Sequence, residues 1–279
     1  MIPNDPLRDW KESAKYWAEY RNTIRAMFAP VTSTLLEQAG IARGQCVLDV
    51  AGGPGEPSLT IAELVGPEGH VTCTDALAEM VDAARAEAQS RGLTNVAFRQ
   101  CLAEALPFDS YSFDAVVCRL GVMFFPDPLT ALREMLRVAK PGAPLALAVW
   151  DKSEVNPFSY VITRIISRHL ETPPADADAP GAFRFAESGK LAGLLKQAGA
   201  RDVTEEVLKF HIAAPISPAE FWTMRSKTSE TLQAKLAKVT EEKKAEIATE
   251  VLQGLQEFFP HNQMEFPAQM IIVTGRKPD

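Results

Sequence analysis

The sequence has no long hydrophobic run, no excess of basic residues, and few cysteines or histidines. No apolar stretch reaches the roughly 18 residues of a membrane-spanning helix, and the first residues lack the basic start and apolar core of a signal peptide. The 29 Lys and Arg residues are outnumbered by 36 Asp and Glu, which gives a formal charge of −7 and no dominant basic surface for a nucleic acid. We therefore expect a soluble, cytoplasmic protein with no membrane span and no nucleic-acid partner.

Residues that usually hold metals or act as nucleophiles are also scarce. None of the 4 cysteines belongs to a C-x-x-C pair, and each lies in a short apolar run, which is typical of buried free thiols rather than of disulfides or zinc ligands. The 4 histidines are expected to be structural or exposed, so the sequence predicts no metal site and assigns no catalytic residue. The cysteines are Cys46, Cys73, Cys101 and Cys118, and the histidines are His70, His169, His211 and His261.

Between about residues 45 and 150, short β-rich runs alternate with longer amphipathic stretches. This alternation is typical of βαβ units and predicts an α/β fold with a parallel sheet. The 279 residues, 46% of them apolar, suffice for one large domain with an appendage. The predicted strands are 46–50, 70–74, 96–100, 115–118, 144–150, 202–212 and 270–275, and the predicted helices among the first five are 57–65, 78–91 and 128–138.

Two longer segments follow the fifth and sixth predicted strands, at residues 151–187 and 213–266. Loops that follow parallel strands emerge at the carboxyl edge of a sheet, where ligands bind. We expect both segments to form a helical lid over an apolar acceptor pocket, with a homodimer interface as the alternative role of the second. Within them the sequence predicts a helix at 157–170, a proline-rich connector at 173–180, a capping box at Ser217–Glu220 and a helix at 240–259.

A glycine-dense turn, Ala51-Gly52-Gly53-Pro54-Gly55, follows the first predicted strand. Glycines let backbone N–H groups approach a ligand closely. The dinucleotide fingerprint G-x-G-x-x-G is incomplete because Ser58 stands at its third glycine, and the phosphate-binding sequence G-x-x-x-x-G-K-[ST] is absent.

Two acidic residues accompany this turn. Asp49, at the end of the first strand, would repel a pyrophosphate but attract an ammonium group. Asp75 ends the second strand, 20 residues after Gly55, where a carboxylate can bind both hydroxyls of a ribose. S-adenosylmethionine carries a ribose and an ammonium group and has no phosphate, so these features favour it as the cofactor.

With these features the sequence resembles the class I S-adenosylmethionine-dependent methyltransferases, in the branch of the ubiquinone/menaquinone-biosynthesis C-methyltransferases. The resemblance covers about residues 45–212, with a weaker echo at 266–276. It implies a Rossmann-like sheet of seven mostly parallel strands with an antiparallel last strand, helices on both faces, an N-terminal helical cap at 1–44 and a methyltransferase domain at 45–279. The segments that carry it are Val47–Gly55, Thr74-Asp75, Ala103–Phe108, Ser112–Val116, Leu132–Glu134 and Lys140-Pro141-Gly142.

The resemblance also implies which residues hold the cofactor. The family commonly has an aspartate that accepts from the adenine amine where this chain has Leu102, so either Glu104 or Gln100 takes its place or the bond is absent and the affinity weaker. By position, Asp49, Ala51, Gly52, Gly53 and Gly55 would hold the methionine moiety, Asp75 the ribose, Ala76 and Met80 the adenine face, Ala103 and Glu104 its edge, and the Arg119 backbone the amino group.

The acceptor is expected to be a small, hydrophobic or aromatic molecule. Methyl transfer from a sulfonium needs mainly alignment and exclusion of water, and a base only if the nucleophile must lose a proton. An NAD(P)-dependent oxidoreductase is the first alternative, disfavoured by Ser58 and Asp49, and a non-catalytic cofactor-binding regulatory protein is the second, because no base is evident. The candidate pocket residues are Tyr16, Trp17, Tyr20, Met123, Asn156 and Tyr160.

Overall fold

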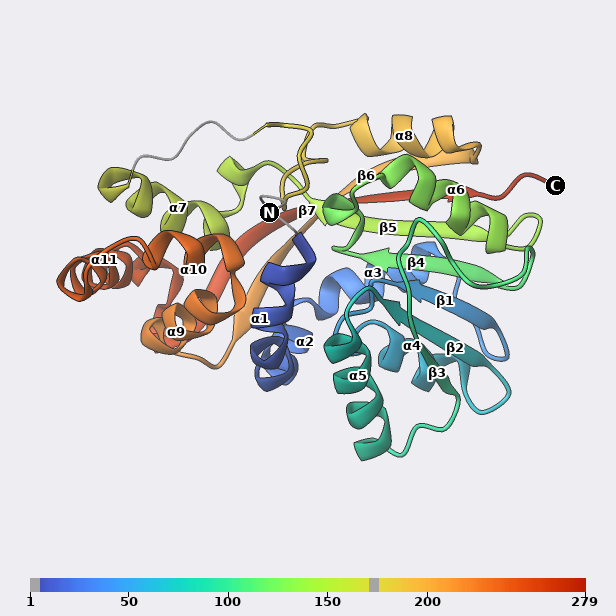
Figure 1. Ribbon diagram of the computed structural model, residues 1–279, viewed down its shortest axis with the longest axis horizontal. Helices are drawn as coiled ribbons and strands as arrows, with labels where there is room; N and C mark the ends of the chain where they lie inside the picture. Colours follow the sequence, from blue (N-terminus) through green and yellow to red (C-terminus); the bar gives the residue numbers. More distant parts are fainter. Residues whose placement is uncertain (1–5, 171–175) are drawn as a thin grey trace. The chain divides into compact units, whose positions relative to one another are not determined.

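The computed structural model describes residues 6–170 and 176–279, which form two compact units (Figure 1). The sheet unit comprises Ala29–Asp151, Pro180–Leu208 and Met270–Asp279. The helical unit comprises the described residues of 1–28, 152–179 and 209–269. The predicted connector at 173–180 lies partly outside the described residues.

The sheet has seven strands in the order β3-β2-β1-β4-β5-β7-β6. Neighbouring pairs among the first five strands are parallel, and β7 runs antiparallel to β5, so the predicted α/β fold is confirmed. The last strand starts earlier than the predicted residue 270. The strands are β1 (Cys46–Val50), β2 (His70–Asp75), β3 (Val96–Gln100), β4 (Ala115–Arg119), β5 (Pro144–Trp150), β6 (Arg201–Ala214) and β7 (Met264–Arg276).

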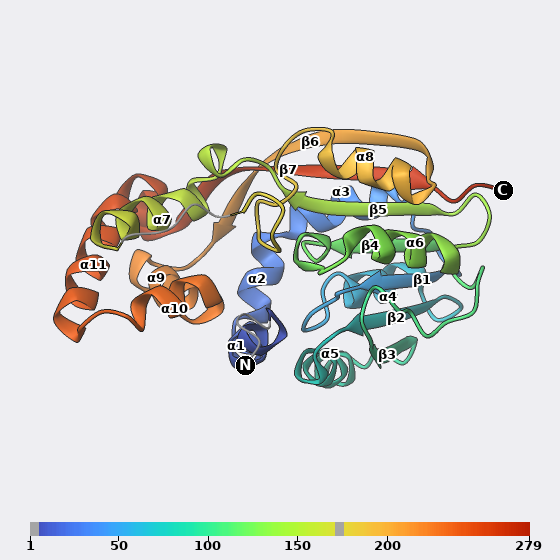
Figure 2. The same cartoon turned by 45° about the horizontal axis from the view of Figure 1, so that its top comes forward.

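Helices cover both faces of this sheet. The chain moves outward from β1 to β3 and then returns to β4, so right-handed crossovers place the helices before and after that return on opposite faces. Figure 2 shows α6 and α8 together in front of the sheet, with α3 behind it. The helices are α3 (Ala29–Gln38), α4 (Ser58–Val65), α5 (Ala78–Ser90), α6 (Pro128–Val138) and α8 (Lys190–Ala198).

The strand order predicts a ligand-binding crevice between β1 and β4. β1 pairs with β2 on one side and with β4 on the other, so the segments after β1 and β4 lead to opposite faces of the sheet. β1 and β4 are almost fully buried, which explains why they are apolar except for Asp49 and Arg119. The glycine turn after β1 therefore opens at this crevice.

The N-terminal region divides earlier than the predicted residue 44. Helix α3 buries Val31, Leu35 and Leu36 and packs against β4 and β5, so it belongs to the sheet unit. The boundary lies after Phe28 because the apolar face of α3 is buried against the sheet.

The helical unit gathers three separate stretches of sequence around a phenylalanine core. Phe266 on β7 lies with its ring centroid 4.8 Å from that of Phe258, 5.1 Å from Phe221 and 5.8 Å from Phe158. All four side chains are buried. Its helices are α1 (Pro6–Glu19), α2 (Arg21–Met27), α7 (Pro157–His169), α9 (Pro218–Thr228), α10 (Glu230–Leu236) and α11 (Glu241–Gly254), and its 3₁₀ turns are η2 (Ser153–Val155), η3 (Gln256–Phe258) and η4 (Pro260–Asn262).

Local helix signals in this unit are partly confirmed. Ser217 and Glu220 form the predicted capping box at the start of α9. The helix predicted at 240–259 ends at Gly254, and η3 follows it. Phe258 in this turn is buried and belongs to the phenylalanine core. No helix in the described ranges is long and apolar enough to cross a membrane.

The segment at 180–187 belongs to the sheet unit, so the first insertion is shorter than predicted. Gly181 donates its N–H to the Met123 carbonyl over 3.0 Å, and Arg184 Nη1 donates to the Phe125 carbonyl over 2.6 Å. The Phe183 ring lies 6.4 Å from the Trp150 ring. These contacts anchor the segment beside the ends of β4 and β5, whereas the expected lid stays a prediction.

Candidate cofactor site

The turn between β1 and α4 is held in a left-handed backbone conformation. Ala51, Gly53 and Gly55 have φ angles of 59°, 56° and 119°. Glycine adopts such angles at little cost, but alanine does so under strain. Strained residues cluster at functional sites, and this turn combines the strained Ala51 with two left-handed glycines.

The N–H groups of the three turn glycines are already bonded within the protein. Gly52 donates to the Thr74 carbonyl over 2.8 Å, and Gly55 donates to the Gly52 carbonyl over 3.1 Å. Gly53 donates to Asp75 Oδ2 over 3.0 Å. A phosphate-binding turn needs such groups to point at the ligand. This turn therefore offers close backbone approach without a phosphate cradle.

Gly52 lies where no other side chain fits. A Cβ atom there would lie 2.7 Å from Asp49 Oδ2 and 2.8 Å from Cys73 Sγ. The glycine thus lets the turn lie directly over the end of β1 and over the carboxyl group of Asp49.

Asp49 is fully buried beneath the turn. Its Oδ2 accepts a hydrogen bond from Ser58 Oγ over 2.5 Å, while its Oδ1 has no hydrogen-bond partner among the described residues. Burial raises the pKa of Asp49 to about 7, although the bond from Ser58 and the charge of Arg119 oppose the shift. The predicted contact of Asp49 with an ammonium group stays a prediction.

Asp75 braces the turn from the end of β2. Its two carboxylate oxygens accept the N–H groups of Gly53 and Leu77, each over 3.0 Å. Burial raises the pKa of Asp75, and these backbone bonds limit the shift. Each oxygen keeps a second lone pair, so the carboxylate can also accept from two hydroxyl groups.

The residues predicted to contact adenine lie after β2 and β3. Met80 and Ala103 are buried, Ala76 is half-buried, and Leu102 is 48% exposed. Gln100 Nε2 donates to the Ala76 carbonyl over 3.0 Å, which ties these two strand ends together.

Glu104 and Gln100, the predicted substitutes for the missing aspartate, each already make one hydrogen bond within the protein. Glu104 Oε1 accepts the Asp127 N–H over 3.2 Å, and the amide nitrogen of Gln100 is used as described above. Each side chain retains one oxygen that could accept from an adenine amine. Their role stays a prediction.

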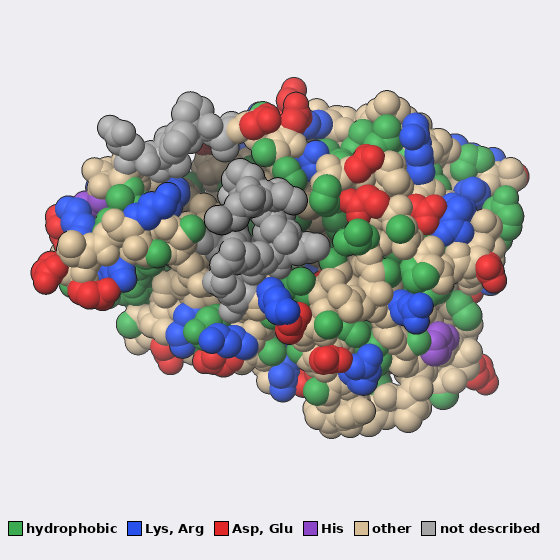
Figure 3. All heavy atoms as spheres, viewed as in Figure 1, with side chains coloured by type: hydrophobic (Ala, Val, Ile, Leu, Met, Phe, Trp, Pro, Cys, Tyr) green, Lys and Arg blue, Asp and Glu red, His purple; other side chains and the backbone are tan. Residues whose placement is uncertain are grey.

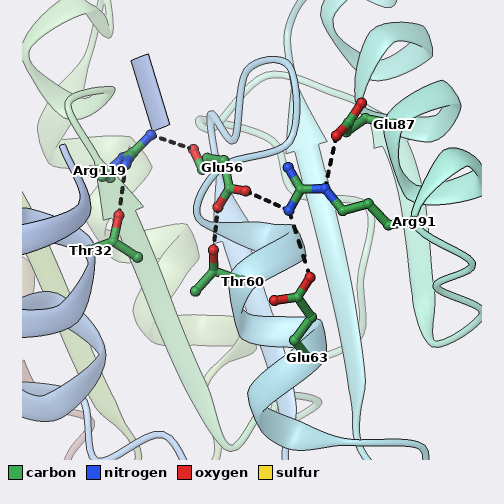
Figure 4. Close-up of polar contacts among 7 residues, drawn as sticks. All are labelled: Thr32, Glu56, Thr60, Glu63, Glu87, Arg91 and Arg119. Carbon is green, nitrogen blue, oxygen red and sulfur yellow. Dashed lines mark hydrogen bonds and ion pairs between the residues drawn. The ribbon is translucent and has the colours of Figure 1, made fainter. Parts of the chain in front are cut away.

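The side chain of Arg119 has a structural role that the sequence did not reveal. Arg119 Nη1 donates to Thr32 Oγ1 over 2.7 Å, and Nη2 donates to the Glu56 carbonyl over 3.0 Å (Figure 4). Burial lowers the pKa of Arg119, against the charges of Glu56 and Asp49. The guanidinium thus holds the end of the glycine turn to helix α3.

Figure 4 shows that this network continues across α4 to α5. Glu56 Oε1 lies 2.9 Å from Arg91 Nη1, and Glu87 Oε1 lies 2.8 Å from Arg91 Nε. Glu56 Oε2 also accepts from Thr60 Oγ1 over 2.6 Å. Glu56, Glu87 and Arg91 are at most 14% exposed, so largely buried charges at the end of α5 support the turn.

Ser58 and Arg119 show what sequence reasoning missed at this site. The sequence identifies Ser58 only as a departure from the dinucleotide fingerprint, and it predicts a role only for the backbone of Arg119. The hydroxyl of Ser58 meets Asp49 because the turn folds back over β1, and no local pattern encodes that contact.

The predicted acceptor residues are divided between the two units. In the sheet unit, Met123 is buried in η1 (Val122–Phe124). In the helical unit, Asn156 is buried, and its amide bonds the Lys152 carbonyl and the Gln269 N–H, each over 2.9 Å. This gives Asn156 a structural role that the prediction did not include.

The aromatic candidates of the helical unit are half-buried. Lys227 Nζ lies 5.3 Å from the Tyr16 ring centroid and 5.8 Å from that of Tyr20. The Trp17 ring lies 5.6 Å from that of Trp10, and Arg164 lies 5.7 Å from the Tyr160 ring. Their role as acceptor contacts stays a prediction.

All 4 cysteines are free, as predicted, but only Cys73 and Cys118 are buried. Cys101 lies just after β3 and is half-buried, as is Cys46. Burial raises the pKa of Cys101 to about 11 and that of Cys118 to about 12. Neither thiol is activated as a nucleophile.

Comparison with known proteins identifies a family whose match includes this turn. The ubiE/COQ5 methyltransferase family matches residues 32–166, which include the whole glycine turn. A ubiquinone/menaquinone biosynthesis C-methyltransferase UbiE of Yersinia pestis is 33% identical over 189 residues, which cover 63% of this chain and 74% of that protein.

The chain belongs to the ubiE/COQ5 methyltransferase family. The predicted resemblance is thereby confirmed. A second member, the UbiE of a Marinomonas species, is 38% identical over 136 residues, which cover 48% of this chain and 54% of that protein. The chain thus spans about half of the length of that relative.

The fold is shared with solved methyltransferase structures. A putative methyltransferase of Bacillus halodurans has a TM-score of 0.57 and 24% identity, with 89% of this chain and 99% of that chain covered. The predicted Rossmann-like architecture is confirmed.

Proposed function

We propose that this protein is an S-adenosylmethionine-dependent methyltransferase that acts on a small hydrophobic or aromatic acceptor. The observation that carries the proposal is the glycine turn. The N–H groups of its three glycines are bonded internally, and two carboxyl groups lie at its base and side. This arrangement disfavours a pyrophosphate and suits a ligand with a ribose and positive charge. Membership of the ubiE/COQ5 family supports the same cofactor.

The residues present fit this cofactor. When bound, S-adenosylmethionine supplies an electrophilic methyl group on a sulfonium, which is a good leaving group. Asp75 would accept from the ribose hydroxyls through its remaining lone pairs. Asp49, with an unbonded Oδ1 beneath the turn, would favour a cation above it. Met80 and Ala103 would present apolar surface to the adenine ring.

The acceptor class is inferred from the ends of β4 and β5. Met123, Phe125 and Trp150 are buried there, and the 180–187 segment adds Phe183 beside Trp150. An apolar environment of this kind excludes water and favours a hydrophobic or aromatic molecule. Basic and acidic side chains are interspersed over the face seen in Figure 3, which favours a small molecule over a nucleic acid as acceptor.

The cytoplasm is the proposed location, because four unpaired cysteines suit a reducing compartment. Helices α1 and α2 and the lid insertions remain part of the proposal as the source of acceptor selection. A homodimer through the second insertion is the competing role, and light scattering of the purified protein separates the two.

Calorimetric binding of S-adenosylhomocysteine, S-adenosylmethionine and NADH tests the proposal. We expect the two sulfur compounds to bind and NADH not to bind. Asp75→Asn should weaken their affinity by roughly 10- to 100-fold, because the amide has one acceptor oxygen where the carboxylate has two. Asp82→Asn, an exposed change on α5, should leave affinity unchanged.

Each other outcome selects an alternative. Binding of NADH alone would indicate an NAD(P)-dependent oxidoreductase and refute the proposal. Binding of S-adenosylmethionine without turnover against a panel of aromatic and hydrophobic acceptors would favour a regulatory protein. Equal affinities of the Asp75→Asn and Asp82→Asn variants would show that the ligand does not use Asp75.

A further inference from the structure

Helices α7 and α11 pack through matching stripes of residues in the helical unit. A Cβ atom at Gly254 would lie 3.0 Å from Ile165 Cδ1 and 3.5 Å from Val161 Cγ1, so the two helices approach closely there. Continuing each stripe by four residues at a time places His169 on α7 against Glu250 and then Glu246 on α11.

These three side chains form a compact set of potential metal ligands. One ligand atom from each lies within 4.8 Å of the others. His169 Nε2 lies 3.0 Å from Glu250 Oε1, and His169 Nδ1 lies 4.0 Å from Glu246 Oε1. Two atoms that share a zinc ion at about 2.1 Å lie roughly 3.0–3.4 Å apart. The first distance therefore matches one edge of a coordination polyhedron.

The imidazole of His169 gives the strongest indication of a metal site. The side chain of His169 is 8% exposed, yet its Nε2 has no hydrogen-bond partner among the described residues. It lies beside Glu250 Oε1 at hydrogen-bond distance but without hydrogen-bond alignment. A buried nitrogen that does not point at its neighbouring oxygen can share a third atom with it.

Two basic side chains hold the carboxylates of Glu246 and Glu250 through their Oε2 atoms. Lys243 Nζ lies 2.7 Å from Glu246 Oε2, and Arg168 Nη1 lies 3.9 Å from Glu250 Oε2. Both Oε1 atoms are thereby left toward His169. Held ligands of this kind are typical of metal sites. His169 also lies in the last turn of α7, where the helix dipole favours a cation.

We propose that His169, Glu246 and Glu250 bind a divalent transition-metal ion, such as Zn²⁺, that fastens α7 to α11. One nitrogen and two oxygen ligands suit Zn²⁺ better than Ca²⁺ or Mg²⁺, which prefer oxygen alone. This site departs from the expectation that the chain binds no metal. It lies in the helical unit and is independent of the proposed cofactor site.

Isothermal titration of ZnCl₂ into untagged, EDTA-dialysed protein tests the site. We expect one saturable site per chain and a higher melting temperature with Zn²⁺, because a ligand of the folded state stabilises it. His169→Ala and Glu250→Gln should each weaken affinity more than tenfold and abolish the melting shift. Co²⁺ should give visible absorption bands in the wild type that are absent from both variants.

Two matched variants control for adventitious binding. His211→Ala removes an exposed histidine on β6, and Glu241→Gln removes an exposed acid that pairs with Lys244 on the same helix as the site. Both should bind Zn²⁺ like the wild type. Circular dichroism in EDTA checks folding, and Glu250→Gln, which preserves side-chain shape, decides if His169→Ala does not fold.

Two results would overturn the proposal. One is the absence of saturable Zn²⁺ binding to the wild type. The other is equal affinity and equal melting shift in the wild type and Glu250→Gln. Either result would leave the three side chains as a polar contact between two helices.

Discussion

The buried carboxyl group of Asp49 gives this protein an unusual dependence of stability on pH. Burial raises the pKa of Asp49 from 3.8 to about 7 in the folded protein. The folded state therefore holds this proton more tightly than the unfolded state does. The resulting stabilisation is complete below pH 4 and is lost as the pH rises through 7.

The magnitude follows from the two pKa values. Between pH 5 and about pH 7 the folded state holds one proton more than the unfolded state. One pH unit of this difference corresponds to about 1.4 kcal/mol, so stability should fall by about 3 kcal/mol between pH 5 and pH 8. The charge of Arg119 and the Ser58 bond are already included in the raised value.

Asp49→Asn removes the titration while nearly preserving the side-chain shape. The variant pays a fixed penalty for its unbonded amide, but that penalty is independent of pH. We therefore expect its free energy of unfolding, relative to that of the wild type, to rise by about 3 kcal/mol between pH 5 and pH 8. Urea denaturation at several pH values measures this difference.

Asp114→Asn provides a control, because the pKa of Asp114 is shifted in the opposite direction from that of Asp49. Burial alone would raise the pKa of Asp114, but its bonds to Lys140 and to the Cys46 N–H and the charge of Lys140 lower it overall. Its contribution is present above pH 4 and is lost as the pH falls further. Parallel pH profiles for the wild type and Asp49→Asn would refute the reasoning about Asp49.

Three further changes test other parts of the structure by urea denaturation. Gly52→Ala should destabilise the protein by about 1–3 kcal/mol, because the added methyl group would collide with the atoms below the turn. Gly193→Ala, which adds a methyl group in open space on α8, should stabilise the protein by up to about 1 kcal/mol. Equal effects of the two changes would contradict the close approach at Gly52. Phe266→Ala should cost about 3–5 kcal/mol because it empties the centre of the phenylalanine core, and a loss under 1 kcal/mol would contradict that placement. Arg91→Met should cost about 3 kcal/mol because Glu56 and Glu87 lose their buried positive partner. Adding Glu56→Gln should recover part of the loss, and strict additivity of the two changes would show that the pair is not coupled.

The sequence alone was sufficient for the sheet and for the turn that carries the cofactor proposal. The strands at 46–50 and 144–150 are as predicted because strands buried on both faces require continuous apolar runs. The sequence also predicts the capping box at Ser217 and Glu220, because both partners lie within one helical turn. These features depend on short stretches of chain.

Other features depend on residues that only the folded chain brings together. The Ser58 bond to Asp49 requires the turn to fold over β1, and the Arg119 bonds require α3 to pack on the sheet. The phenylalanine core joins three separate segments of sequence, and His169 meets Glu246 and Glu250 only because α7 packs on α11. Local periodicity encodes elements and their apolar faces, whereas the choice of partner is made by burial across the whole molecule.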